Sequence, residues 1–254
     1  MTTSGATPTN CCAWRYSSNM LKTGQRLLES LAAALFPPRC ALCLCELPTL
    51  EIVCSDCASS LPSFEGPRCQ RCCGPVDDPS IDLCPRCGTQ LHAVDRVFSL
   101  GPYHGDWGCL VRAFKFEREM AIGRWLGERM AAALLARNAV RDFSAITFDP
   151  MTRRDRRVRG FNQAEVLARV IAKQLNLPLV RMLAKTRDTP PQGGLSAVER
   201  RTNLRDVFRL LPCRQEHVLL VDDIYTTGST VEECGRTLKR GGAQSVVAMA
   251  VARA

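Results

Sequence analysis

The residues with the clearest chemistry lie in the stretch VLLVDDIYTTGST, residues 218–230. Its apolar start is typical of a buried parallel strand, which ends in the carboxylates Asp222 and Asp223. A loop rich in hydroxyl groups follows, and a helix is predicted after it. Hydroxyls, backbone N–H groups beside a glycine and the positive end of a helix dipole all favour a bound phosphate. The predicted phosphate loop comprises Thr226, Thr227, Gly228, Ser229 and Thr230.

Two carboxylates directly before a phosphate loop suit the hydroxyls of a ribose or a Mg²⁺ ion. A sugar with a 5′-phosphate and free 2′- and 3′-hydroxyls would fit both halves of the stretch. The stretch differs from the P-loop of nucleoside triphosphatases, because the pattern GxxxxGK[ST] is missing. The alternative interpretation is an incidental acidic turn at the end of a Rossmann-like strand.

Cysteine is the second residue type with evident chemistry. The chain has 15 cysteines, and eight of them form four Cys-x-x-Cys pairs. Such a turn directs both sulfurs at one centre, and two turns complete a closed tetrahedron around Zn²⁺. The predicted ligands of two structural zinc sites are Cys40, Cys43, Cys54, Cys57, Cys69, Cys72, Cys84 and Cys87.

Several alternatives stay open for these cysteines. A metal-free cluster, a redox pair or iron–sulfur ligation would use similar spacing. The pairs can combine in sequence or interleaved, Cys73 could replace Cys72, and Cys45 lies beside the first pair. Catalytic zinc is disfavoured, because a closed four-sulfur site leaves no open coordination position. Chain length, the odd count and the lack of a secretory pattern disfavour disulfides.

Arginine forms a third concentration of chemistry. Lysine and arginine number 34 against 25 acidic residues, a net charge of +9. Five arginines lie within residues 153–159, in a loop expected between a strand and a helix. Such a loop would face the carboxyl ends of the strands, where ligands bind in this kind of fold, and we expect Arg159 inside the site and Arg153 and Arg154 outside it. A solvated basic loop or a nucleic-acid patch is the alternative. His92, His104 and His217 are interpreted as surface or packing residues.

The elements that position these residues follow from the apolar pattern. We expect strands at 93–100, 144–150, 177–183, 217–223 and 245–252, and helices at 21–36, 106–136, 162–175 and 230–240. Asn162 is the expected cap of its helix, and the helix over 106–136 is expected to break near Gly123. Residues 185–203 are expected to form a long polar loop. Strands that alternate with helices predict an α/β fold with a mostly parallel sheet.

Composition divides the chain into three expected parts. Residues 1–36 are expected to be a leader and an N-terminal helix, with Met1 or Met20 as the true start. Residues 37–90 hold the four cysteine pairs, and residues 91–254 form the α/β part. The apolar stretch from Leu31 to Phe36 is too short to span a membrane. Without a secretory pattern, we expect a cytoplasmic protein that does not insert into membranes.

Residues 218–230 resemble the signature by which type I phosphoribosyltransferases bind phosphoribosyl pyrophosphate (PRPP). Together with RGFNQAEVLA (159–168), the loop at 187–204 and the cysteine pairs, they resemble the ComF family (ComFC and GntX-like proteins). In that family a double zinc ribbon precedes a phosphoribosyltransferase domain. The resemblance covers about residues 37–254. The family's PVP-type segment before RGFNQ reads Asp149-Pro150-Met151 in this chain.

The resemblance implies a type I phosphoribosyltransferase-like sheet over residues 91–254, flanked by helices and preceded by a double zinc ribbon over 37–90. It implies a catalytic set of Asp222, Asp223 and Arg159. Mg²⁺–PRPP would lie against both acids and the phosphate loop, with its pyrophosphate near Arg159 and Gly160. A hood loop would contribute Gln192, Arg200 and Asn203, and Lys115 matches a further family segment. A ring-nitrogen or amine acceptor would need no general base.

The implied role is in natural transformation, because ComF proteins are implicated in that process. Incoming single-stranded DNA and competence-machinery proteins such as a helicase would then be partners. The acceptor of a phosphoribosyl transfer cannot be identified from the residues. A second hypothesis is a zinc-ribbon nucleic-acid-binding or adaptor protein with a catalytically silent phosphoribosyltransferase fold. The net charge of +9 is compatible with either hypothesis.

Overall fold

The computed structural model describes residues 37–48, 51–140, 143–188, 206–213 and 215–254. The chain divides into two compact units, Met1–Cys57 and Ala58–Ala254. The helix expected over residues 21–36 and most of the loop expected over residues 185–203 lie outside the described residues. Each unit is described by itself below.

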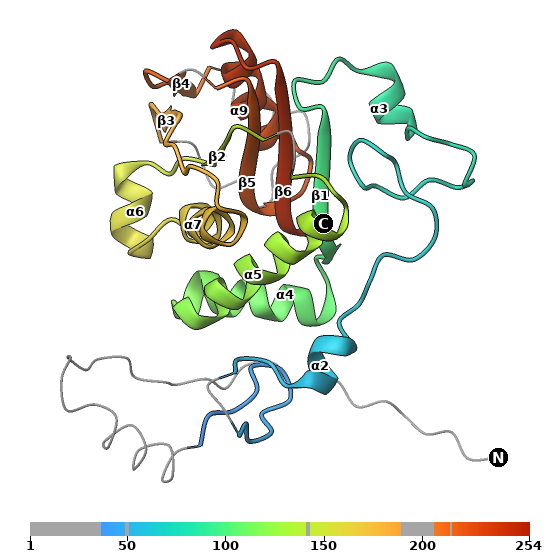
Figure 1. The fold of residues 1–254 in the computed structure, drawn as a ribbon, viewed down its shortest axis with the longest axis vertical. Coiled ribbons are helices and arrows are strands. Elements are labelled where there is room, and N and C mark those ends of the chain that lie inside the picture. The colour runs from blue at the N-terminus through green and yellow to red at the C-terminus, as the bar shows by residue number, and fades with distance from the viewer. Residues whose placement is uncertain (1–36, 49–50, 141–142, 189–205, 214) are drawn as a thin grey trace. The chain divides into compact units, whose positions relative to one another are not determined.

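The second unit is built on a four-stranded sheet in the order β1-β6-β5-β2 (Figure 1). The strands are β1 (Arg96–Pro102), β2 (Ala145–Phe148), β5 (His217–Tyr225) and β6 (Ser245–Arg253). Every neighbouring pair is parallel, and the register places Val218 between Ala145 and Val246. Residues 218–222 of β5 are all buried, as the continuous apolar run predicted for a central parallel strand. The α/β prediction is confirmed.

Helices cover both faces of this sheet (Figure 1). On one face lie α4 (Gly105–Arg112), α5 (Met120–Ala136) and α7 (Gln163–Leu175), and α9 (Ser229–Arg240) lies on the other. Asn162 caps α7 as predicted, since its side-chain oxygen accepts from Glu165 N at 3.2 Å. On the opposite face, Val218 and Leu220 of β5 share a core with Val231 of α9.

The helical region 106–136 breaks earlier than expected. A π-helical turn (Ala113–Glu117) follows α4, and Arg118 has a φ of 60° before α5 begins. Gly123 lies inside α5, so the prediction of a break there was wrong. A Cβ at Gly123 would collide with the ring of Phe114, so a glycine is needed there for packing.

Two further segments differ from the prediction. The arginine-rich residues form a short helix, α6 (Arg153–Arg159), capped by Thr152, which accepts from Asp155 N at 3.1 Å. Of residues 177–183, only Leu179 bridges the main sheet, opposite Ile146. The next strand, β3 (Leu183–Lys185), pairs antiparallel with β4 (Phe208–Leu210) in a separate two-stranded sheet. Periodicity did not reveal these features, because short segments take their structure from tertiary contacts.

The two cysteine-rich segments repeat one backbone pattern. Cys40 N donates to Cys45 O at 2.9 Å, and Cys69 N donates to Gly74 O at 2.8 Å. Both turns contain a residue with positive φ, Leu44 at 65° and Cys73 at 56°. The short helices α2 (Ser55–Ser59) and α3 (Pro85–Thr89) complete the two segments. None of the helices that the structure describes is long and apolar enough to cross a membrane.

The second cysteine-rich segment packs on the edge of the main sheet. Val97 N of β1 donates to Arg71 O at 2.6 Å, and Arg96 Nε donates to Gln70 O at 2.9 Å. Cys72 is buried in the same core as Val94. The segment therefore covers an edge strand that would otherwise expose unpaired backbone groups.

Candidate functional site

Two groups of four sulfurs have the geometry of tetrahedral metal sites. Within each group all four sulfurs lie within 4.8 Å of one another. Cys43 Sγ lies 3.8 Å from Cys54 Sγ, and Cys72 Sγ lies 3.8 Å from Cys84 Sγ. A tetrahedron with Zn–S bonds of about 2.3 Å has sulfur–sulfur edges of about 3.8 Å. The groups are Cys40, Cys43, Cys54 and Cys57, and Cys69, Cys72, Cys84 and Cys87.

This geometry settles how the cysteine pairs combine. The pairs combine in sequence, and Cys72 rather than Cys73 belongs to the second group. Cys73 Sγ points elsewhere and donates to Val97 O at 3.2 Å. Gly74 N donates to Cys72 Sγ and Cys54 N donates to Cys40 Sγ, both at 3.4 Å. Such N–H donors stabilise thiolates, and a closed set of four thiolates fits structural zinc.

A cavity of about 760 Å³ lies at the carboxyl ends of the parallel strands. Ligands in open α/β sheets bind at this end. Its described walls come from β5, the start of α9, α6, the start of α7, the π-helical turn and β3. The predicted residues that line it are Asp222, Asp223, Thr226, Gly228, Ser229, Thr230 and Arg159.

An acidic cluster forms the floor of the cavity. Asp222, only 8% exposed, is the last residue of the buried part of β5, and Asp149 follows β2. Burial raises the pKa of Asp222 well above its usual value, and Asp149 and Asp223 raise it further. Lys115 Nζ lies 2.8 Å from Asp223 Oδ2, and the lysine side chain is 17% exposed. Lys115 is therefore part of the site and not an exposed helical lysine.

The predicted phosphate loop, residues 226–230, runs from the end of β5 into the first turn of α9. Gly228 has a φ of 78°, and a Cβ there would collide with the hydroxyl of Tyr225. Only glycine combines that backbone angle with so close a neighbour. Thr227 Oγ1 and Ser229 Oγ lie 2.8 Å apart, and α9 begins at Ser229. The loop thus brings a helix N-terminus and hydroxyls to the cavity, as an anion requires.

Arg86 connects the second cysteine group to the phosphate loop. It lies between Cys84 and Cys87 in the sequence. Arg86 Nη1 donates to Thr227 O at 2.9 Å, and Nη2 donates to Tyr225 Oη at 3.2 Å. Tyr225 is 2% exposed, and burial raises its pKa to about 12. Arg86 therefore holds the phosphate loop against a cysteine segment that is distant in the sequence.

The arginines of α6 lie on the opposite wall. Arg154 and Arg159 both line the cavity, although the side chain of Arg154 is 79% exposed. Arg156 pairs with Glu165 at 3.1 Å. Gly160, with a φ of 86°, ends the helix and turns the chain toward α7. Arg159 therefore lies inside the cavity. Arg154 was expected to face solvent; most of its side chain does so, but it also lines the cavity.

Sequence reasoning missed Asp149 and Lys185 as site residues. Both line the cavity, and Asp149 Oδ1 accepts from Cys234 Sγ at 3.6 Å. The available signal was the position of Asp149 near the end of the strand expected at 144–150, which matches the position of Asp222 near the end of the strand expected at 217–223. His92 has an acidic partner that was not foreseen, since its Nδ1 lies 2.7 Å from Glu232 Oε1, away from this cavity. Gln192, Arg200 and Asn203 lie outside the described residues.

Replacing Asp149 by asparagine should stabilise the protein at high pH. Burial raises the pKa of Asp149 from near 3.8 to about 7, Lys185 opposes the rise and Asp223 adds to it. The folded state therefore holds a proton that the unfolded state releases, and stability falls as the pH rises from about 4 to 7. We expect D149N to raise the free energy of unfolding at pH 8 by roughly 1 to 3 kcal/mol, and to change it little at pH 4.

Urea unfolding of wild type and D149N at both pH values measures this effect. The matched control is D77N, which removes a carboxylate from an exposed position. An equal change at pH 4 and pH 8 would contradict the raised pKa of Asp149. An effect of the same size in D77N would contradict it as well.

Comparison with known proteins gives the class and the family. Residues 162–254 match the phosphoribosyl transferase domain, and residues 31–88 match the double zinc ribbon domain. The parallel sheet, the acidic pair and the phosphate loop therefore belong to a protein of the phosphoribosyltransferase class that carries a double zinc ribbon.

Three relatives match this chain over most of their own length. Competence protein F of Haemophilus influenzae is 32% identical over 80% of this chain and 90% of its own. DNA utilization protein YhgH of Salmonella typhimurium is 33% identical over 83% of this chain and 94% of its own. YhgH of Escherichia coli K12 is 30% identical over 76% of this chain and 87% of its own. The chain belongs to the competence protein F (ComF) family.

Proposed function

We propose that the cavity at the carboxyl ends of β2 and β5 binds PRPP together with Mg²⁺. The observation that carries this proposal is the phosphate loop directly after Asp222 and Asp223, facing the arginines of α6. The phosphoribosyl transferase match over residues 162–254 supports it, because PRPP is the donor that this class uses. PRPP would engage both halves of this cavity, because it carries ribose hydroxyls, a 5′-phosphate and a pyrophosphate.

The chain's residues would divide the ligand between them. The loop from Thr226 to Thr230 would hold the 5′-phosphate, through hydroxyls and the N-terminus of α9. Asp222 and Asp223 would hold the ribose hydroxyls, and the carboxylates offer oxygen donors that fit Mg²⁺. Arg159 would contact the pyrophosphate from the facing wall, and Gly160, which ends α6 directly after it, would contact it as well.

We also propose transfer of the ribosyl group to a nitrogen acceptor. Arg159 would stabilise the negative charge of the departing pyrophosphate, which is the main electrostatic demand of the step. Gln192, Arg200 and Asn203 would close over the ligand from the hood loop. Lys115 would orient Asp223 through their contact of 2.8 Å. A ring nitrogen or amine acceptor needs no general base.

The test measures binding and turnover separately. Calorimetry of the full chain with PRPP should show binding that requires Mg²⁺. A PRPP-consumption screen over bases, amines and single-stranded DNA should then identify the acceptor through release of pyrophosphate. Lack of PRPP binding would refute the proposal. Binding with no consumption by any acceptor would favour the catalytically silent alternative.

We propose a role in the handling of incoming single-stranded DNA during natural transformation. The relatives named competence protein F and DNA utilization protein support this role. Competence-machinery proteins such as a helicase would be partners, and a reducing cytoplasm would suit eight cysteines held as two structural zinc sites. The proposed parts are 1–36, a double zinc ribbon at 37–90 and a phosphoribosyltransferase domain at 91–254. Transformation frequency in a deletion strain, with and without the wild-type gene, tests the role.

A further inference from the structure

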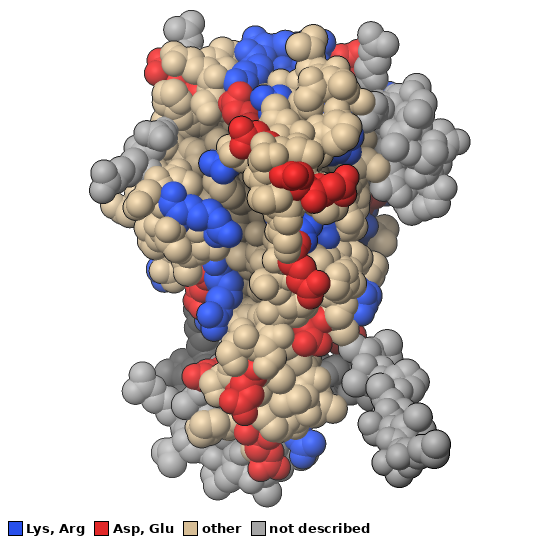
Figure 2. Space-filling model, turned by 90° about the vertical axis from the view of Figure 1, so that its right-hand side faces the viewer, with Lys and Arg blue, Asp and Glu red and all other residues tan. Residues whose placement is uncertain are grey.

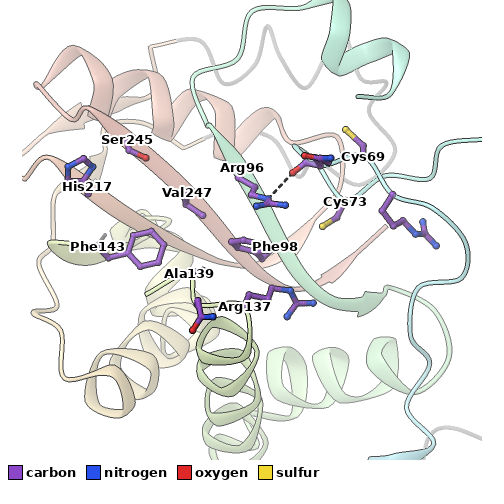
Figure 3. Close-up of a pocket in the computed structure, with 13 residues that line it drawn as sticks. Cys69, Cys73, Arg96, Phe98, Arg137, Ala139, Phe143, His217, Ser245 and Val247 are labelled. Atoms are coloured by element: carbon purple, nitrogen blue, oxygen red, sulfur yellow. Dashed lines mark hydrogen bonds between the residues drawn. The ribbon is translucent and has the colours of Figure 1, made fainter. Parts of the chain in front are cut away.

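A second cavity, of about 620 Å³, lies at the other end of the sheet (Figure 3). Arg96, His217 and Ser245, the first residues of β1, β5 and β6, line it. The proposed PRPP cavity lies at the carboxyl ends of the strands, whereas this groove lies at their amino ends. The two cavities share no lining residue. We call this second cavity the amino-end groove.

Three arginines line the amino-end groove, and no carboxylate is among the described residues that line it. Arg96 comes from β1, Arg137 follows α5, and Arg68 precedes the second cysteine group. Within the described part of the chain, none of the three forms an ion pair. The groove therefore holds three arginines that pair with no described carboxylate, although Cys69 of the second metal group also lines it.

Each of these guanidinium groups is already held in place. Arg96 Nε donates to Gln70 O at 2.9 Å, Arg137 Nη1 donates to Ala133 O at 3.0 Å, and Arg68 Nη2 donates to Glu65 O at 2.6 Å. A guanidinium has five N–H donors, so each arginine keeps several for a ligand. Arg68 Nε is buried without a hydrogen-bond partner in the described structure.

Aromatic rings lie beneath the arginines. Arg96 lies 5.1 Å and Arg137 lies 5.8 Å from the ring centre of Phe98, and Figure 3 shows both beside that ring. Phe143 and Val247 extend the apolar floor toward His217. Guanidinium planes stacked on rings present flat surfaces on which a base can stack. Phosphate alone would need no such floor.

The positive charge of the groove is local and not a property of the whole surface. On the face shown in Figure 2, basic and acidic side chains lie interspersed. The net charge of +9 therefore does not by itself create a uniform basic face. A lining of three arginines without an acid is a specific concentration of charge, which is how anion-binding surfaces are recognised.

We propose that the amino-end groove binds nucleotide phosphates, with Arg68, Arg96 and Arg137 on the phosphates and the apolar floor against a base. The phosphates can belong to a nucleic-acid strand or to a free nucleotide. If the ligand is a nucleic-acid strand, the inference rests on the single-stranded DNA partner proposed above and assigns its binding site to this groove. It is independent of PRPP binding.

The experiment measures fluorescence anisotropy of a labelled 20-nucleotide oligo(dT) with the full-length, zinc-loaded chain between 50 and 200 mM NaCl. R96Q/R137Q removes two groove charges, and R124Q/R209Q removes two exposed charges that line neither of the two cavities. We expect R96Q/R137Q to weaken binding at least tenfold. The slope of log K against log salt should fall by about 1.4, or about 0.7 for each lost phosphate contact.

Competition distinguishes the two sources of phosphate. If unlabelled oligo(dT) displaces the probe and dTMP or ATP at the same nucleotide concentration does not, the ligand is a strand; equal displacement identifies a free nucleotide. Both variants should keep the wild-type melting temperature and Mg²⁺–PRPP binding. The inference is wrong if both variants weaken binding equally, or if wild type binds none of the probes. The second result would also remove the DNA partner while leaving PRPP binding untouched.

Discussion

Replacing Asp222 and Asp223 together by asparagine should abolish PRPP binding while leaving the protein folded. In the proposed complex each carboxylate makes charge-assisted contacts with ribose hydroxyls or Mg²⁺, and asparagine can supply neither the charge nor both acceptor oxygens. Loss of two such interactions, at about 1.5 to 3 kcal/mol each, corresponds to a fall in affinity of roughly 100- to 10,000-fold. Calorimetry with Mg²⁺–PRPP measures the change.

The burial of Asp222 makes this a clean test. Burial and the neighbouring carboxylates raise its pKa, so the charged form is unfavourable in the folded apoprotein. Asparagine has nearly the same shape and removes that penalty. We therefore expect D222N/D223N to melt at the wild-type temperature or above, although the contact from Lys115 to Asp223 weakens. Undiminished PRPP binding by a folded double variant would refute the site.

Loss of the two metal groups should have very different consequences. Cys72 belongs to the group that shares a core with the main sheet, whereas Cys54 lies in the separate first unit. We expect C72S to lower the melting temperature of the second unit by about 6 to 12 °C, from a loss of about 3 kcal/mol, and to weaken PRPP binding about tenfold, because the segment that carries Arg86 loses its metal. C54S should release one zinc per chain and leave PRPP affinity within about twofold of wild type, because Cys54 belongs to a different unit from the residues that line the cavity.

C73S is the matched control for C72S, and R86A tests the contact between the second cysteine group and the phosphate loop separately from the metal. Cys73 is adjacent to Cys72 but lies outside the metal group, and its Sγ donates to Val97 O. C73S should keep two zincs per chain and normal binding. R86A should keep its zinc yet weaken PRPP binding roughly tenfold, because Thr227 O and the hydroxyl of Tyr225 lose their donor. Equal PRPP affinity in C72S and C54S would contradict the connection between the second group and the phosphate loop.

Much of the fold and part of the site followed from local patterns. The run at 217–223 predicted β5 because a central parallel strand is apolar on both faces. Asn162 predicted the start of α7 because a side-chain cap acts within one turn. The break expected at Gly123 was wrong, since that glycine makes room for Phe114, a requirement that periodicity does not contain.

By itself the sequence determined the phosphate loop, its acidic pair and the eight metal-binding cysteines, because their chemistry depends on spacing within a few residues. Only the tertiary structure decided which cysteines share a centre and that Cys73 is not among them. It also brought Lys115 to Asp223, Arg86 to the phosphate loop, and three arginines to the amino-end groove. These contacts join residues far apart in the chain, and their positions depend on how the strands and helices pack.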